Sequence, residues 1–398
     1  MKRPICFFVH HQGRGHAART RAIVSRMAAD RPVSVATADP SLFDGFQRDI
    51  ELIELPNMIG ARVPTAALHA HATPETMHCV PLGLREMRVT MRRILDHLDD
   101  RNVGLFAIDV SAELAQLARI ASVPAVKVRM HGSRNDPGHQ AAYAACTGML
   151  APFDAALEQP DYPDRLRAKT FYTGGLCTHE AVPPAKAEAR RRLGLPDDAE
   201  IVLAMAGGGG HGLAYAPLTV AARAAPETLF VTVGRLHREG HETDFANLVN
   251  HGWVEHTAEY IAAADIVVAS AGDNMVTEIA KVGRPYVCIP EWRYFDEQSA
   301  KAERLAAVGA ALHVERQPGD LVGWQAILEQ ARQLDVARLQ PLHDPSAAEH
   351  AAGWLEATTD RLWDSGATLA RPQEAVIDLG SRRLAVGSDA GPIPDQIG

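Results

Sequence analysis

The chain has 398 residues, a length that predicts two domains at about 100–200 residues each. Its composition, with 46% hydrophobic and 22% charged residues, is that of a globular protein and excludes disorder over most of its length. The 40 Lys and Arg residues against 49 Asp and Glu residues give a net charge of −9. Because non-specific nucleic-acid binding needs a basic face, we expect no nucleic-acid partner.

The sequence also predicts a cytoplasmic protein. No apolar run approaches the ~18 residues that a transmembrane helix needs, and the apolar stretch near the N-terminus is too short for a signal peptide. The cysteines are scattered and form no C-x-x-C pair, which favours reduced thiols. They are Cys6, Cys79, Cys146, Cys177 and Cys288.

In the first half, short apolar runs alternate with helical patterns. We expect strands at residues 5–9, 33–36, 50–55, 103–108 and 125–128. Helices are expected between them at 17–29, 74–98 and 112–121. Continuous β-branched runs are typical of strands that are buried on both faces of a parallel sheet.

The same pattern then starts again. Strands are expected at 201–206, 229–233, 266–269 and 286–289, and helices at 186–193, 213–224, 258–263, 274–281 and 297–307. The sequence thus predicts an α/β protein with two Rossmann-like, doubly wound domains that face each other across a cleft. The expected units are domains at 1–173 and 174–345, a C-terminal helix at 346–370 and a poorly ordered tail at 371–398.

The first motif is Gly13-Arg14-Gly15-His16, which follows the first strand and opens the first helix. Glycines at such a turn let backbone amides approach a ligand. Ala18 stands where a dinucleotide-binding fingerprint needs its third glycine, so that fingerprint is excluded. The positive end of the helix should leave His16 uncharged and able to accept a proton. The alternative is that His16 only caps the helix.

Asp109 follows the expected strand at 103–108, at the edge where α/β sheets place their sites. A parallel sheet should bring it close to His16. A carboxylate bonded to one ring nitrogen would fix the imidazole tautomer and leave the other nitrogen as a base. The alternative is that Asp109 caps the helix that begins near Ser111.

The segment 207–212 contains five glycines in six positions. Glycine costs folding entropy, so this density predicts close backbone approach to a ligand, and the following helix N-terminus suits phosphate. No Gly-Lys-Ser/Thr is present, which excludes an ATPase-type P-loop. The alternative is a flexible turn.

A third motif repeats the order of strand, glycine turn and helix around Gly272. Glu278 lies six residues later and could chelate a ribose diol. Asp296 and Gln298 lie at the start of another expected helix, where they could bind sugar hydroxyls. The alternative for each acid is an ordinary solvated side chain.

Together, these motifs resemble the GT-B glycosyltransferases. The chain is most similar to the bacterial family 28 enzymes that add N-acetylglucosamine to the undecaprenyl-linked peptidoglycan precursor, and also to the UDP-glycosyltransferases. The resemblance implies a nucleotide-diphosphate sugar, a UDP-sugar first of all, as donor. The acceptor would be a small molecule, a glycan or a lipid-linked molecule. The resemblance further implies inversion at the anomeric carbon, with no cofactor and no metal ion.

The resemblance also implies roles for residues of the second half. Glu278 would hold the donor ribose, and Asn274 would hold the diphosphate with Gly208, Gly209 and Gly210. Gly272 would form the turn before them, Asp296 and Gln298 would bind the transferred sugar, and the backbone near Val254 would bind uracil.

In the first half, the resemblance implies that His16 is the general base and Asp109 the acid that orients it. The acceptor-side loop would consist of Gly13, Arg14 and Gly15. The loop at 129–134 should also line the acceptor side.

Two alternative functions stay open at this point: a nucleotide-sugar 2-epimerase and a non-catalytic nucleotide-sugar-binding protein. The basic and apolar helix at 85–95 could make weak peripheral contact with a membrane, or it could be an ordinary amphipathic helix. His69 and His71 form a short pair, but acidic ligands in register are missing, so we predict no metal site there.

Overall fold

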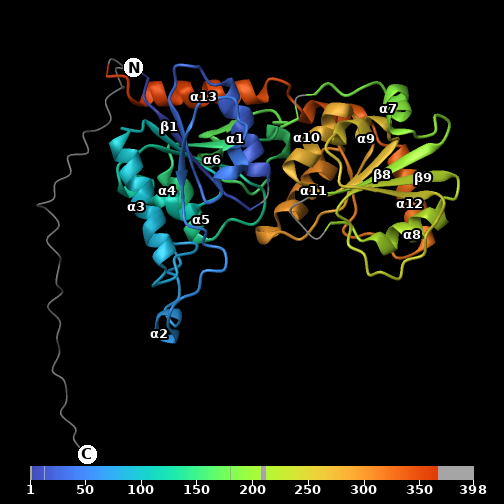
Figure 1. Cartoon of the computed structure of the whole chain (residues 1–398), viewed down its shortest axis with the longest axis horizontal. Coiled ribbons are helices and arrows are strands. Elements are labelled where there is room, and N and C mark those ends of the chain that lie inside the picture. Colours follow the sequence, from blue (N-terminus) through green and yellow to red (C-terminus); the bar gives the residue numbers. More distant parts are fainter. Residues whose placement is uncertain (1, 13, 180, 208–211, 366–398) are drawn as a thin grey trace, which may run out of the picture.

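The computed structural model describes residues 2–12, 14–179, 181–207 and 212–365. Gly13, Gly208, Gly209, Gly210 and the expected tail at 371–398 lie outside the described residues. Figure 1 shows two α/β domains side by side, the N-terminal one in blue to green and the other in green to orange. Within the described part of the chain, none of the helices combines the length and the hydrophobicity of a transmembrane span.

The N-terminal domain is built on a seven-stranded, fully parallel sheet with the order β3-β2-β1-β4-β5-β6-β7. β1 and β2 are buried along their whole length, since helices cover both faces. The strand order reverses between β1 and β4, which makes a topological switch point there. The strands are β1 (Ile5–Val9), β2 (Val33–Thr37), β3 (Glu51–Glu54), β4 (Leu105–Ile108), β5 (Ala125–Val128), β6 (Gly148–Ala151) and β7 (Thr170–Tyr172).

The second domain has a six-stranded parallel sheet with the order β10-β9-β8-β11-β12-β13. Its switch point lies between β8 and β11, and the predicted two-domain α/β fold is confirmed. The strands are β8 (Glu200–Ala206), β9 (Thr228–Gly234), β10 (Leu248–Gly252), β11 (Ile266–Ala269), β12 (Tyr286–Cys288) and β13 (Leu312–His313).

The helices of the N-terminal domain include one that differs from expectation. A helix over 74–98 is wrong at its start, because α3 begins only at Arg85, after Gly83 with φ +85°. α3 buries Thr90, Ile94 and Leu98 on one face, as an ordinary amphipathic helix does. The helices are α1 (Gly15–Arg26), α2 (Ala66–His69), α3 (Arg85–Asp100), α4 (Ala112–Ile120), α5 (Pro137–Ala145) and α6 (Asp164–Arg167).

The remaining helices follow β7 along the chain. They are α7 (Lys186–Leu193), α8 (Tyr215–Ala224), α9 (Thr257–Ala263), α10 (Asp273–Val282), α11 (Glu297–Ala307), α12 (Leu321–Arg332) and α13 (Ala347–Leu362). Short 3-10 helices are η1 (Pro40–Phe43), η2 (Ala155–Leu157), η3 (Tyr294–Asp296), η4 (Val336–Arg338) and η5 (Gln340–Leu342). The last long helix, α13, returns to the N-terminal domain, where Ala351 and Leu355 join the same apolar core as Ile23 of α1 (Figure 1).

The chain therefore passes between the domains twice, and the two connections touch. Gly175 has φ +102°, and a Cβ there would overlap the carbonyl oxygen of Leu342. The Asp344 backbone N–H donates to the Gly175 carbonyl at 3.1 Å. Glycine at 175 thus lets the outgoing and returning segments lie side by side, next to the domain boundary expected between residues 173 and 174.

Candidate active site

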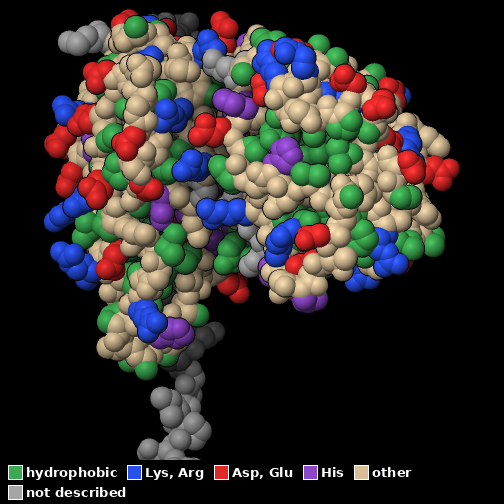
Figure 2. Space-filling model, turned by 45° about the vertical axis from the view of Figure 1, so that its right-hand side comes forward, with side chains coloured by type: hydrophobic (Ala, Val, Ile, Leu, Met, Phe, Trp, Pro, Cys, Tyr) green, Lys and Arg blue, Asp and Glu red, His purple; other side chains and the backbone are tan. Residues whose placement is uncertain are grey.

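The two switch points face each other across the domain junction. α1 follows β1 in the N-terminal domain, and α10 follows β11 in the C-terminal domain. A Cβ built on Gly15 would lie 3.7 Å from Nδ2 of Asn274, so the starts of the two helices meet directly. Figure 2 shows Lys, Arg and His side chains gathered along this junction.

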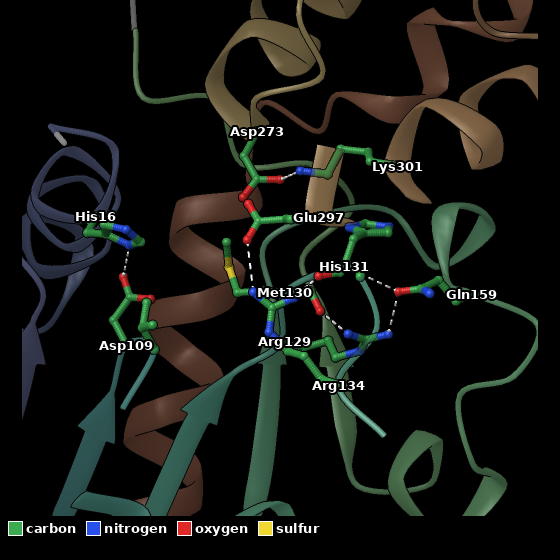
Figure 3. Close-up of polar contacts among 12 residues, drawn as sticks. His16, Asp109, Arg129, Met130, His131, Arg134, Gln159, Asp273, Glu297 and Lys301 are labelled. Atoms are coloured by element: carbon green, nitrogen blue, oxygen red, sulfur yellow. Dashed lines mark hydrogen bonds and ion pairs between the residues drawn. The ribbon is translucent and has the colours of Figure 1, made fainter. Parts of the chain in front are cut away.

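His16 and Asp109 are brought together as the parallel sheet required (Figure 3). His16 Nδ1 lies 2.9 Å from Asp109 Oδ2, with the Asp109 side chain 5% and the His16 side chain 21% exposed. An Nδ1–H that donates to this carboxylate leaves Nε2 of His16 as the proton acceptor. The pair is thus arranged as an oriented base that solvent can still reach.

The backbone after β4 turns sharply to place Asp109. Val110 has φ +74°, which is an outlier for a β-branched residue, and its carbonyl accepts a hydrogen bond from the buried Lys127 ammonium. Burial lowers the pKa of Lys127 to about 8. The side chain that caps α4 is Ser111, whose hydroxyl oxygen accepts from Leu114 N at 3.2 Å. The capping alternative for Asp109 is therefore wrong.

Arg19 is a member of this site that sequence reasoning missed. It lies one turn after His16 on α1 and is 5% exposed. One terminal nitrogen donates to Asp109 Oδ2 at 2.8 Å and to Oδ1 at 3.1 Å, and the other donates to Asp273 Oδ2 at 3.3 Å. The three-residue spacing from His16 was the available signal, since it puts both side chains on one helix face.

Asp273 opens α10 and links the domains. Its carboxylate pairs with Arg19 of the N-terminal domain. It also pairs with the buried Lys301 of α11, as Figure 3 shows. Burial raises the pKa of Asp273, but the charges of Lys301 and Arg19 outweigh it and hold the pKa at about 2. For Asp109, burial is likewise outweighed by Arg19 and His16, which keep its pKa far below the usual range. Both carboxylates are therefore ionised, and neighbouring basic side chains balance their negative charges.

A second contact between the domains involves the predicted sugar-binding segment. Ser133 N donates to the Phe295 carbonyl at 2.7 Å. Gly132 has φ +105°, and a Cβ there would overlap that carbonyl oxygen. Phe295 and Asp296 have φ of 63° and 53°, a left-handed conformation that is costly for non-glycine residues. The loop at 129–134 thus contacts the segment that leads into α11.

Buried ion pairs hold this loop. Arg134 pairs with Glu297 of α11 at 2.9 Å (Figure 3). Arg129 pairs with the buried Glu158 at 2.7 Å. The loop was expected to line the acceptor side, and the structure places it against the start of α11. These ion pairs thus hold the loop of the N-terminal domain against the left-handed turn at Phe295 and Asp296.

Glu278 is 6% exposed on α10 and already has partners. The Thr257 hydroxyl donates to Oε2 of Glu278 at 2.7 Å, and His179 forms an ion pair with Oε1. The hydrogen bond to Glu278 raises the pKa of His179. A ribose that binds Glu278 would therefore compete with His179 for this carboxylate.

Gln298 is buried and is used by the fold. Its side-chain oxygen accepts from Ala271 N at 3.2 Å and from Glu291 N at 2.9 Å, so it joins the turns after β11 and β12. Only its NH2 group is left for a ligand. Asp296, in contrast, is exposed.

The remaining predicted residues lie as follows. Gly272 is the N-cap residue of α10, and Asn274 is half-buried in its first turn. Val254 follows β10, is half-buried and packs against the core of the C-terminal domain. Arg14 is the exposed N-cap residue of α1.

Parts of the chain match known proteins in sequence. Residues 219–332 match the glycosyltransferase family 28 C-terminal domain. The chain is 32% identical over 163 residues to a UDP-N-acetylglucosamine–N-acetylmuramyl-(pentapeptide) pyrophosphoryl-undecaprenol N-acetylglucosamine transferase from Halorhodospira halophila. That match covers 38% of this chain and 44% of the relative, less than half of its length.

Solved structures agree over nearly the whole chain. The crystal structure of Acinetobacter baumannii MurG superposes with a TM-score of 0.62 at 16% identity, covering 90% of this chain and all of MurG. The calicheamicin glycosyltransferase CalG4 gives 0.63 at 17% identity, covering 91% of this chain and 100% of CalG4. The chain thus shares the two-domain fold of these glycosyltransferase structures, and its residues 219–332 match the glycosyltransferase family 28 C-terminal domain.

Proposed function

We propose that the protein is a glycosyltransferase that moves a sugar from a UDP-sugar to an acceptor hydroxyl, with His16 as the general base. One observation carries this proposal above all: the hydrogen-bonded pair of His16 and Asp109, 2.9 Å apart, on the wall of the junction that faces the start of α10. A base on one wall and a helix N-terminus on the other suit an acceptor and a diphosphate, respectively.

In the proposed reaction, Nε2 of His16 takes the proton of the acceptor hydroxyl. The freed oxygen forms a bond to the anomeric carbon while the bond from that carbon to the diphosphate oxygen breaks, and the electron pair leaves with the nucleotide. Asp109 stabilises the imidazolium that forms. Because the oxygen attacks from the face opposite the leaving group, an α-linked donor gives a β-linked product.

The start of α10 would stabilise the leaving group. Its free backbone amides and helix dipole favour negative charge. A carboxylate at this position would normally repel a diphosphate, but Asp273 is paired with Arg19 and Lys301. The compensated charge of Asp273 therefore leaves the helix start able to accept phosphate oxygens, with Asn274 beside it.

The donor is proposed from the relatives. The similar protein from Halorhodospira halophila is named for transfer of N-acetylglucosamine from its UDP derivative, which supports a UDP-sugar here, with Glu278 as ribose ligand. The proposed reaction needs neither cofactor nor metal ion. A cytoplasmic location suits such a donor and agrees with cysteines that form no disulfide in the described part of the chain.

The test begins with the donor. A thermal-shift screen of UDP-, dTDP- and GDP-sugars should single out a UDP-sugar, because a ligand that binds only the folded form raises the midpoint temperature. With that donor and a panel of small-molecule, glycan and lipid-linked acceptors, NMR should show an inverted anomeric coupling in the product. Retention would contradict the mechanism. Epimerised sugar formed without any acceptor would instead support the nucleotide-sugar 2-epimerase.

A further inference from the structure

A second cluster of side chains that could bind a ligand lies outside the pair of His16 and Asp109. His78, Asp136 and His139 each offer one ligand atom, and these atoms all lie within 4.8 Å of one another. We propose that these three side chains bind a divalent transition-metal ion such as Zn²⁺. The proposal does not depend on sugar transfer.

Two of the ligands are already fixed relative to each other. Asp136 is the N-cap residue of α5, with Oδ1 accepting from His139 N at 3.0 Å. Its other oxygen, Oδ2, lies 2.6 Å from Nδ1 of His139. Ligands of one tetrahedral Zn²⁺, each about 2.0–2.2 Å from the ion, lie about 3.4 Å apart. A bound ion would thus replace the proton shared by Asp136 Oδ2 and His139 Nδ1, and these two side chains would move slightly apart.

The third ligand is held close to α5 by its backbone. A Cβ on Gly138 would lie 2.6 Å from the Met77 carbonyl carbon and 2.8 Å from His78 N, so glycine is what lets the segment lie directly on the helix. Cys79 N donates to Glu113 Oε1 at 2.6 Å and fixes the next residue. The exposed His78 side chain can therefore rotate to close the site while its backbone stays in place.

The donor set favours a transition metal over Mg²⁺ or Ca²⁺. Two imidazoles and one carboxylate are ligands of Zn²⁺ and its neighbours, whereas Mg²⁺ and Ca²⁺ prefer oxygen atoms. His139 is 3% exposed, so its ring is held in place by packing. Water would complete the coordination on the exposed side of His78.

The location gives the ion a structural role. The ring of Phe295 lies 4.9 Å from the His139 ring and 5.3 Å from the His78 ring, measured between centroids. Phe295 belongs to the C-terminal domain and directly precedes Asp296. A bound ion would tie the segment around His78 to α5 at the point where the second domain rests on both imidazoles.

The test uses the full chain without a polyhistidine tag, freed of metal by a chelator. Calorimetry with Zn²⁺ should show one ion per chain. His78→Ala should weaken binding and raise the dissociation constant at least about tenfold. His78 is exposed, so its loss should leave the fold intact. The matched controls are His69→Ala and His71→Ala, which remove exposed histidines of the same segment and should leave the affinity unchanged.

A second variant separates coordination from folding. Asp136→Asn keeps a good N-cap residue for α5 but removes the anionic ligand, so it too should weaken Zn²⁺ binding. Hydrogen exchange should slow around His78 when Zn²⁺ is added to the wild type, and not in His78→Ala. Absence of one-to-one binding, or equal affinity in His78→Ala and the two control variants, would overturn the proposal, because either result assigns the binding to surface histidines alone.

Discussion

The two switch points of the molecule have the same topology but present different chemistry. After β1 and β4, the N-terminal domain presents side chains: the imidazole of His16, the carboxylate of Asp109 and the guanidinium of Arg19. After β11, the C-terminal domain presents backbone amides at the start of α10, with its one acid neutralised by Lys301 and Arg19. In the proposed reaction, the same architecture would serve proton transfer on one wall and anion binding on the other.

The two walls also depend on each other. Arg19 bonds to Asp109 in its own domain and to Asp273 in the other, and Arg134 crosses the junction to Glu297. Removing one partner of a buried pair leaves an uncompensated charge, which costs far more than an exposed pair would. The comparison therefore predicts that changes on the N-terminal wall alter the turnover number and that changes on the C-terminal wall alter donor affinity. Changes at the contacts between the domains should alter turnover without altering the affinity for UDP.

The largest effect is expected for His16→Ala. Loss of a general base should lower the turnover number by about 10²- to 10⁴-fold, with the dissociation constant of UDP unchanged. Steady-state kinetics and calorimetry measure the two quantities. The exposed His71→Ala serves as the matched control. A weakened UDP affinity with unchanged turnover would place His16 on the donor side and contradict the division between the walls.

Gly132→Ala should break the junction. An added Cβ would overlap the Phe295 carbonyl oxygen, and φ +105° is strained for alanine, so keeping this contact between the domains should cost about 1–3 kcal/mol. We expect the turnover number to fall roughly ten- to hundredfold while UDP binding persists.

The matched control is Gly45→Ala. Gly45 also has a positive φ, of +66°, but nothing lies within 4 Å of an added Cβ. It should lower the midpoint of thermal unfolding and leave turnover intact. Equal turnover in Gly132→Ala and wild type would show that the contact with Phe295 has no catalytic consequence.

Glu278→Gln should affect donor affinity. A charge-assisted hydrogen bond to a ribose hydroxyl becomes a neutral one, which weakens UDP binding by about tenfold. Calorimetry with UDP measures this change, and Glu303→Gln on the exposed face of α11 is the control. An unchanged dissociation constant would remove Glu278 from the donor site.

The smallest effect is expected for His179→Ala, and it depends on pH. The ion pair with Glu278 needs protonated His179, whose pKa is raised by that hydrogen bond. The pair therefore persists below the raised pKa and is lost as the pH rises through it, so wild-type UDP affinity should increase with pH. His179 is half exposed, and an ion pair of that kind contributes up to about 1 kcal/mol.

His179→Ala should accordingly bind UDP about three- to fivefold more tightly at acidic pH, an affinity ratio that follows from the same energy. The difference from wild type should vanish at high pH. In the Glu278→Gln background the same substitution should have little further effect, because the negative charge that pairs with protonated His179 is gone. A tighter binding that persists in that background would contradict competition for Glu278.

Elements with strong local signals were predictable from the sequence. β11 and α11 begin and end where expected, since a buried β-branched run and a helical pattern define them. β13 has only two residues, and the edge strand β10 carries the exposed Val249 and the polar Asn250, so neither shows the pattern of a buried strand. β6 lacks β-branched residues altogether.

The residues of the candidate site also differ in how far the sequence could predict them. His16 and Asp109 could be predicted because each follows a strand at the edge where parallel sheets place their sites. The contact of Arg19 with Asp273 could not, because it depends on how two separate domains meet. No local pattern in either segment encodes that arrangement.

The most direct test is a crystal structure of the complex with UDP-N-acetylglucosamine. We predict that the diphosphate lies against the backbone amides of Asp273 and Asn274, and that the anomeric carbon faces Nε2 of His16 across the junction. A nucleotide bound elsewhere, or a sugar whose anomeric carbon points away from His16, would contradict the assignment of donor binding to one wall and proton transfer to the other.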